Sequence, residues 1–178
     1  MYKNLKQLTV ILKVSERCNI NCSYCYFFNG NDQTYKDHAA FISLDTINNT
    51  ADFLSKSIVN HNIKFLRIDF HGGEPLLLKP EYFSQICEIF IKKLDHLTKL
   101  QFVVQTNAIL LNDNWLNILD KYKVNVGVSI DGPPKIHDKY RIDHHNRGTY
   151  ARVRKGIDLL REKKLKKSIN IMVNYRLR

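Results

Sequence analysis

The amino-acid sequence predicts an α/β fold of about five parallel strands and four helices, arranged as a partial, barrel-like sheet that is incomplete at its carboxyl-terminal end. Strand patterns and amphipathic helical patterns alternate along the 178 residues, which is typical of a parallel sheet with right-handed crossovers. Each predicted strand has one apolar and one polar face, whereas a sheet covered by helices on both faces is apolar throughout. Polar motifs follow the carboxyl ends of the strands, where the sites of barrel proteins lie.

The strands are predicted from alternating apolar residues in the segments 7–14, 64–71, 100–106, 124–130 and 168–175. In the fourth segment Val126 and Val128 share one face, while Gly127 and Ser129 share the other. If the apolar faces of the strands pack on helices, their polar faces must line a solvent-filled space. We therefore expect a curved sheet with a lumen rather than a flat, doubly wound sheet.

The helices are predicted from apolar residues that recur every three or four positions in the segments 44–58, 80–94, 112–122 and 149–163. Ser43 and Asn112 are suitable amino-terminal caps for the first and third helices. Pro80 suits the first turn of the second helix, because the amide hydrogen that proline lacks is not needed there.

The composition is that of a globular protein, with 44% hydrophobic residues and a net charge of +11. No apolar run reaches the roughly 18 residues of a membrane-spanning helix, and the first residues lack an apolar signal core, so we expect a cytoplasmic protein. The positive charge keeps nucleic acid among the possible partners. A solvated helix face is nevertheless favoured over an RNA-binding stripe, because much of the charge lies on and after the last helix, at Arg152, Arg154, Lys155, Arg161, Lys163, Lys164, Lys166 and Lys167.

The most informative motif is a group of three cysteines, Cys18, Cys22 and Cys25, directly after the first predicted strand. The spacing is short enough for one loop to wrap a small metal centre. An iron–sulfur cluster held by three thiolates fits this group, because one iron is then left open to a ligand other than the protein. An open iron implies chemistry at that iron.

Zinc and a disulfide are the alternatives to a cluster. Tetrahedral zinc needs a fourth ligand, for which Cys87, His38 and His71 are the candidates. Cys87 lies in an apolar helical pattern, where a thiol is most often a small buried hydrophobic group. A disulfide framework is disfavoured, because the chain carries no secretory signal and no further cysteine pattern.

The spacing Cys18-x-x-x-Cys22-x-x-Cys25, with Tyr24 before the third cysteine, resembles the signature of the radical S-adenosylmethionine (SAM) superfamily. This resemblance implies a partial (β/α)6 barrel, a 4Fe–4S cluster on the three cysteines and SAM chelated to the fourth iron. It also implies that the reduced cluster cleaves SAM to a 5′-deoxyadenosyl radical, which takes a hydrogen atom from the substrate. Tyr24 is then expected beside the adenine of SAM.

The turn after the second strand, Gly-Gly-Glu-Pro at 72–75, extends the resemblance. Alone, this sequence is a plausible tight turn. In the family the equivalent turn contacts the methionine amino group of SAM, which implies a contact from Gly73 with assistance from Glu74.

The segment Gln105-Thr106-Asn107-Ala108 after the third strand is close to a Thr-Asn-Gly motif of the family. Ala108 stands where glycine is usual, so we expect a slightly different turn. Gln105 and Asn107 are candidate cofactor contacts, and a simple polar strand end is the alternative for both.

The longest match follows the fourth strand, where Ser-Ile-Asp-Gly-Pro at 129–133 precedes Ile-His-Asp and Tyr-Arg. It looks like the peptide- and protein-modifying branch of the superfamily, which includes anaerobic sulfatase-maturating enzymes and maturases of ribosomally made peptides. In that branch the serine and the arginine contact SAM, which implies these roles for Ser129 and Arg141. A guanidinium group suits the methionine carboxylate.

The resemblance implies a radical SAM enzyme that modifies a side chain of a peptide or protein, with a reductant such as flavodoxin or ferredoxin as partner. A cross-link, an oxidised residue or an epimer are possible products, and a cross-link is our first expectation. We expect residues 1–178 to form a core domain alone, because no second cysteine group corresponds to the SPASM domain of this branch. A chain that binds cluster and SAM without turnover is one alternative, and an RNA-modifying radical SAM protein is another.

Overall fold

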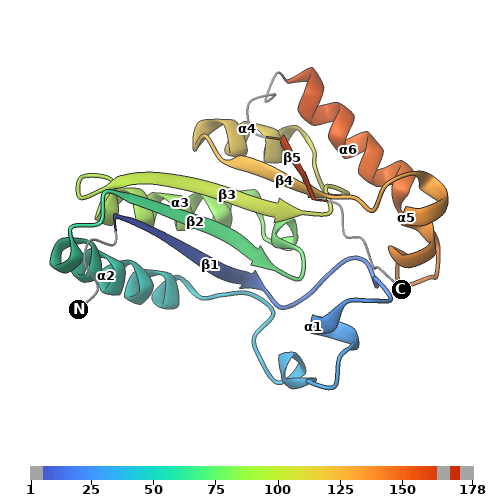
Figure 1. Cartoon of the computed structure of the whole chain (residues 1–178), viewed down its shortest axis with the longest axis horizontal. Helices are drawn as coiled ribbons and strands as arrows, with labels where there is room; N and C mark the ends of the chain where they lie inside the picture. Colours follow the sequence, from blue (N-terminus) through green and yellow to red (C-terminus); the bar gives the residue numbers. More distant parts are fainter. Residues whose placement is uncertain (1–5, 164–168, 173–178) are drawn as a thin grey trace.

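The structure is a computed structural model that describes residues 6–163 and 169–172. One parallel sheet has the strand order β1-β2-β3-β4-β5, so each strand pairs with the next along the chain. The strands are β1 (Gln7–Ser15), β2 (Phe65–Gly72), β3 (Lys99–Thr106), β4 (Asn125–Ser129) and β5 (Ile169–Met172). A sheet built in chain order has the topology of a barrel wall, whereas a doubly wound sheet reverses direction at a switch point. Figure 1 shows the strands side by side, with their carboxyl ends toward the two segments that carry α1 and α5.

Four longer helices follow the strands, as the sequence predicts: α2 (Leu44–His61), α3 (Pro80–Leu94), α4 (Asp113–Lys121) and α6 (Tyr150–Glu162). The Ser43 hydroxyl accepts a hydrogen bond from the Thr46 amide, and the Asn112 side chain accepts one from the Trp115 amide. Both predicted caps are therefore confirmed, and Pro80 begins α3.

The apolar face of the sheet packs on these helices. Leu66, Ile68 and Phe70 of β2 are fully buried. The ring of Phe70 packs edge to face on that of Phe83 of α3, with 4.7 Å between the ring centroids. The opposite face is polar and partly exposed, and there the Arg67 guanidinium donates two hydrogen bonds to the Asp69 carboxylate. The prediction of one apolar face against helices and one polar face is thus confirmed for β2.

The pairing of β1 with β2 becomes irregular at the carboxyl end of β1. Its register with β2 runs regularly to Lys13 opposite His71 and then shifts, so that Ser15 pairs with Gly72. Such a bulge bends a strand and ends regular pairing. The chain leaves the sheet at this point and enters the cysteine loop, defined as residues 16–25.

Two short helices, α1 (Tyr26–Asn29) and α5 (Pro134–Tyr140), and two 3₁₀ turns, η1 (Thr34–Lys36) and η2 (Pro75–Leu77), were not predicted. Part of the last predicted strand, residues 168 and 173–175, and the basic residues Lys164, Lys166 and Lys167 lie outside the described residues. In the described ranges 6–163 and 169–172, every helix is too short or too polar to cross a bilayer.

Candidate functional site: a pocket beside three cysteines

A pocket of about 950 Å³ lies between the cysteine loop, the carboxyl ends of β2, β3 and β4, and α5. This is the place that a barrel topology provides for a site. The residues that the sequence singled out come from segments far apart in the chain, and all of them line this one pocket: Cys18, Cys22, Tyr24, Cys25, Gly73, Glu74, Gln105, Asn107, Ser129 and Arg141.

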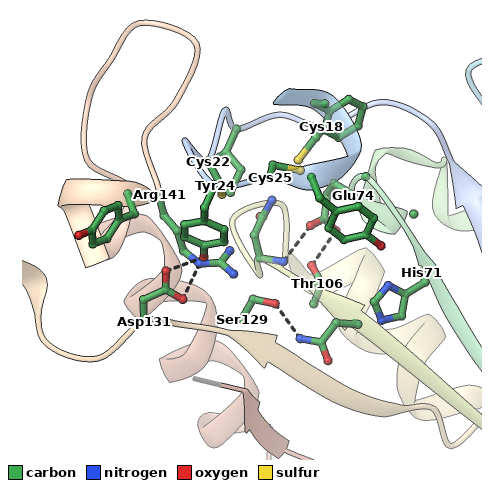
Figure 2. Close-up of a pocket in the computed structure, with 18 of the residues that line it drawn as sticks. Cys18, Cys22, Tyr24, Cys25, His71, Glu74, Thr106, Ser129, Asp131 and Arg141 are labelled. Atoms are coloured by element: carbon green, nitrogen blue, oxygen red, sulfur yellow. Dashed lines mark hydrogen bonds and ion pairs between the residues drawn. The ribbon is translucent and has the colours of Figure 1, made fainter. Parts of the chain in front are cut away.

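The cysteine loop is held by the segment that follows α5. The Asn21 amide donates to the Ile142 carbonyl at 2.7 Å, and the Ser23 amide donates to the Tyr140 carbonyl at 2.9 Å. The amide of Cys25 donates back to the Cys22 carbonyl at 2.9 Å, which tightens the loop just before α1. The three thiols are thereby presented together above the strand ends (Figure 2).

Burial controls the ionisation of two of these thiols. It raises the pKa of Cys18 to about 12 and that of Cys22 to about 11. A metal binds the thiolate form, so binding at these two thiols would release their protons.

The donor set fits a cluster better than a zinc ion. Within the described residues, no three His, Cys, Asp or Glu side chains gather closely enough to hold a single ion. His38 bonds to Glu16 at 2.8 Å, and Cys87 is fully buried in the core, so neither lies in the pocket. His71 does line the pocket, and burial lowers its pKa. All three thiols line the pocket, and thiolates are the ligands that hold the irons of an iron–sulfur cluster.

Arg141 lines the pocket, and the buried carboxylate of Asp131 holds its guanidinium group. Its Nε donates to Asp131 at 2.9 Å, and the Tyr24 hydroxyl donates to the other oxygen of Asp131 at 2.5 Å (Figure 2). The side chain of Arg141 is only 8% exposed, yet its terminal nitrogens make no further hydrogen bond to the described residues. Burial, followed by the Asp131 carboxylate, raises the pKa of Tyr24, so this hydroxyl stays a donor. Buried guanidinium donors of this kind suit a carboxylate ligand.

Ser129 and Gln105 form a second polar contact on the pocket wall. The Gln105 amide donates to the Ser129 hydroxyl at 2.7 Å, which leaves the hydroxyl hydrogen free to donate to a ligand. The Gln105 side chain lies directly over Gly127, where a Cβ would come within 2.2 Å of its amide oxygen. The absence of a side chain at Gly127 therefore makes room for Gln105.

Glu74 joins the ends of two strands. Its buried carboxylate accepts hydrogen bonds from the Leu76 amide at 2.9 Å, the Thr106 hydroxyl at 2.6 Å and the Asn107 amide at 2.8 Å. Burial raises the pKa of Glu74, and these three hydrogen bonds oppose the rise. The carboxylate is a strut between the turn after β2 and the turn after β3.

Gly73 packs directly on the cysteine loop. Its amide donates to the Ser15 carbonyl at 2.7 Å, and the Glu74 amide donates to the Arg17 carbonyl at 2.8 Å. A Cβ on Gly73 would lie 2.1 Å from the Arg17 carbonyl oxygen, so only glycine fits this approach. The turn after β2 thus supports the loop of cysteines besides facing the pocket.

Asn107 contacts the cysteine loop from the turn after β3. Its side-chain amide donates to Asn19 at 2.8 Å, next to Cys18. Ala108 follows with φ of 62°, the left-handed conformation that glycine adopts freely. The turn therefore has the backbone conformation typical of glycine despite the alanine.

Sequence reasoning missed several residues that build the site. It quoted Asp131 only within the motif after the fourth strand, and it gave no role to Thr106, His137 or Thr149. Asp131 and His137 stand in the quoted motif after the fourth strand, and Thr106 in the quoted segment after the third, which was the available signal. Their roles depend on contacts between segments that are distant in sequence.

The comparisons agree with this geometry. The chain is 27% identical over 172 residues to a cysteine-type anaerobic sulfatase-maturating enzyme of Clostridium novyi, covering 96% of this chain and 45% of the relative. It is 30% identical over 158 residues to a serine-type anaerobic sulfatase-maturating enzyme of Bacteroides thetaiotaomicron, covering 88% and 37%. The chain thus spans less than half the length of these relatives.

Solved structures show the same fold. The structure of native anSMEcpe with bound AdoMet and Cp18Cys peptide matches with a TM-score of 0.77 and 26% identity, covering 94% of this chain and 43% of that one. The radical SAM superfamily model matches residues 12–176. The chain, with its three pocket cysteines at the end of a partial barrel, therefore belongs to the radical SAM superfamily.

Proposed function

We propose that this chain is the core of a radical SAM enzyme that modifies a side chain of a peptide or protein. Cys18, Cys22 and Cys25 would hold a 4Fe–4S cluster, and the pocket beside them would hold SAM. When bound, the reduced cluster and SAM supply a 5′-deoxyadenosyl radical, which removes a hydrogen atom from the substrate. The observation that carries this proposal is that three thiols line the same pocket as Arg141, whose terminal nitrogens have no hydrogen-bond partner among the described residues.

Different pocket residues would bind different groups of SAM. Arg141 would take the methionine carboxylate with its terminal nitrogens, while Asp131 holds its Nε. The Ser129 hydroxyl would donate to a polar edge of the cofactor, and Gln105 keeps that hydroxyl oriented. Tyr24 would offer its backbone and ring to the adenine.

The two turns would complete the methionine end. The turn at Gly73 would receive the amino group, and Glu74 would act by holding the turn after β3 close to it. Asn107 would act by fixing Asn19 beside Cys18. These contacts would fix the position of the cysteine loop relative to the bound cofactor.

A peptide or protein substrate is supported by the named activity of the sulfatase-maturating relatives and by the peptide in the matched anSMEcpe structure. The polar face of the sheet, which leads from Arg67 and Asp69 toward the pocket, would receive it. A small reducing protein such as flavodoxin or ferredoxin would supply the electron, and the cytoplasm is the compartment that suits such a partner.

The competing reading as an RNA-modifying protein rests on the basic last helix. In α6, however, Arg152 pairs with Asp143, and Arg154 and Arg161 pair with Asp158. Pairing with carboxylates favours a solvated helix face over a phosphate-binding stripe. Retention of RNA at physiological salt, lost as salt rises, would support RNA instead.

The test is anaerobic reconstitution with iron and sulfide, followed by dithionite and SAM. We expect equal amounts of bound iron and sulfide and the release of 5′-deoxyadenosine. The Cys22→Ala chain should lose the product, while Cys87→Ala, which changes a buried thiol outside the pocket, should retain it.

Three outcomes contradict parts of the proposal. Equal product from Cys22→Ala and the parent would refute the ligand assignment. Stoichiometric zinc without sulfide would refute the cluster. A cluster and bound SAM without 5′-deoxyadenosine would favour the alternative of a chain that binds without turnover.

A further inference from the structure

A buried chain of hydrogen bonds runs behind the pocket from Asp131 to Arg141 through two residues that do not line it. The Asp131 amide donates to His137 Nδ1 at 3.3 Å, and His137 Nε2 bonds to Thr149 Oγ1 at 2.9 Å. The Thr149 hydroxyl then donates to the Arg141 carbonyl at 2.7 Å. His137 and Thr149 are both fully buried. We call this pair the His137–Thr149 relay.

The relay has a single direction. Because the Asp131 amide is a donor, Nδ1 of His137 must be the ring nitrogen without a proton, and Nε2 must carry it. Nε2 therefore donates to Thr149, whose own hydrogen goes to the Arg141 carbonyl. A doubly protonated ring would set two donors against each other at Asp131. Burial and the nearby Arg141 charge lower the pKa of His137, which agrees with a neutral ring.

The Thr149 hydroxyl does not cap the helix that begins after it. Thr149 is the N-cap residue of α6, a position where threonine normally accepts a hydrogen bond from the first turn of the helix. Its side chain makes no such bond, and the Asp138 carboxylate accepts the Tyr150 amide at 2.8 Å instead. The chain thus caps α6 with another residue and uses the hydroxyl for the relay.

Arg141 is the residue where this relay meets the cysteine loop. Its two neighbours, Tyr140 and Ile142, accept the amides of Ser23 and Asn21 from the cysteine loop. Its own carbonyl is the one that Thr149 holds. A shift of the Arg141 backbone would therefore move the guanidinium away from Asp131 and disturb the loop that carries Cys22.

We propose that His137 and Thr149 are positioning residues for SAM binding: they fix Arg141 and Asp131 in the relative placement that presents the guanidinium to the cofactor. This inference rests on the proposed function, in which Arg141 binds the methionine carboxylate. Neither residue lines the pocket, so any effect of changing them on affinity passes through Arg141 and Asp131.

The test is a matched pair at one position, Thr149→Val and Thr149→Ser, in the cluster-loaded chain. Valine keeps the shape but removes the hydroxyl, whereas serine keeps the hydroxyl. We expect the Kd for SAM, measured by equilibrium dialysis, to rise about tenfold in Thr149→Val and to stay near the parent value in Thr149→Ser. Urea unfolding of each variant establishes that the dialysis compares folded chains.

A merely structural role would lower stability without changing the affinity of the folded chain. A parent-like Kd for folded Thr149→Val would therefore overturn the inference, as would a Thr149→Ser chain as weak as Thr149→Val. A parent that carries its cluster but does not bind SAM would instead overturn the proposed function, and the inference with it.

A second measurement holds even if Thr149→Val fails to fold. Nitrogen NMR of the histidine rings in the iron-free parent should show His137 with its proton on Nε2 alone across neutral pH. A proton on Nδ1 would overturn the relay, because the Asp131 amide would then have no acceptor.

Discussion

The hydroxyl of Tyr24 donates a 2.5 Å hydrogen bond to the carboxylate of Asp131, a residue 107 positions further along the chain. Through this bond the cysteine loop is tied to the end of β4. The same carboxylate accepts Nε of Arg141 at 2.9 Å, so one buried acid orients both the loop and the guanidinium. Its two oxygens are thereby shared between Tyr24 of the cysteine loop and Arg141.

The Tyr24→Phe chain should be less stable than the parent by about 1–3 kcal/mol, because an oxygen of the buried Asp131 loses its donor. The free energy of unfolding of the iron-free chain in urea measures this. Tyr26→Phe is the matched control, since Tyr26 is 81% exposed and its hydroxyl has no hydrogen-bond partner among the described residues. Equal stability of the two variants would show that the Tyr24–Asp131 bond contributes nothing.

The Arg141→Lys chain should bind SAM about tenfold more weakly or worse. Lysine keeps one charge near Asp131 but cannot donate from one planar group to both Asp131 and a carboxylate ligand. Equilibrium dialysis of the cluster-loaded chain measures the change. Arg154→Lys, on the exposed face of α6, is the control and should bind SAM like the parent. Unchanged affinity in Arg141→Lys would remove Arg141 from the cofactor site.

Much of the fold is readable from the sequence because it depends on local periodicity. The alternation of Ile68 and Phe70 with Arg67 and Asp69 predicted which face of β2 packs on helices, and the structure agrees. The positions of the site residues were also predictable, since parallel strands bring their carboxyl ends together.

The connections within the site were not predictable in this way. The hydrogen bonds of Tyr24 to Asp131 and of Thr106 to Glu74 join segments that meet only in the folded chain. The His137–Thr149 relay does the same. The short helix α5 was missed for a different reason: seven residues are too few to show a helical period.

Gly73→Ala and Gly127→Ala should differ sharply, although both add one methyl group. At Gly73 the new Cβ would lie 2.1 Å from the Arg17 carbonyl oxygen, which belongs to the backbone. We expect a loss of about 1–3 kcal/mol or more and poor cluster assembly, because the cysteine loop must shift. Urea unfolding and bound iron measure the two effects.

At Gly127 the nearest atoms to the new Cβ all belong to the Gln105 side chain, with its oxygen at 2.2 Å, and this flexible side chain can rotate away. We expect a near-normal iron content and a stability loss below about 1 kcal/mol. SAM should bind more weakly, because Gln105 then no longer orients the Ser129 hydroxyl. A Gly73→Ala chain that assembles its cluster as well as Gly127→Ala would contradict the close approach at Arg17.

Asp143 should make the stability of the iron-free chain fall in acid. Its carboxylate accepts the amides of His145 and Arg147 and pairs with the side chains of Arg147 and Arg152, and these contacts hold its pKa below the usual value. A carboxyl whose pKa is lower in the folded state contributes stability that is present above its unfolded pKa of about 3.9 and is lost as the pH falls below it. The stability difference between the parent and Asp143→Asn, measured in urea, should therefore shrink as the pH falls from 5 toward 3.

Asp120→Asn, which changes an exposed carboxylate with no side-chain partner among the described residues, is the control. A difference for Asp143→Asn that stays constant over this range would show that the contacts do not favour the charged form.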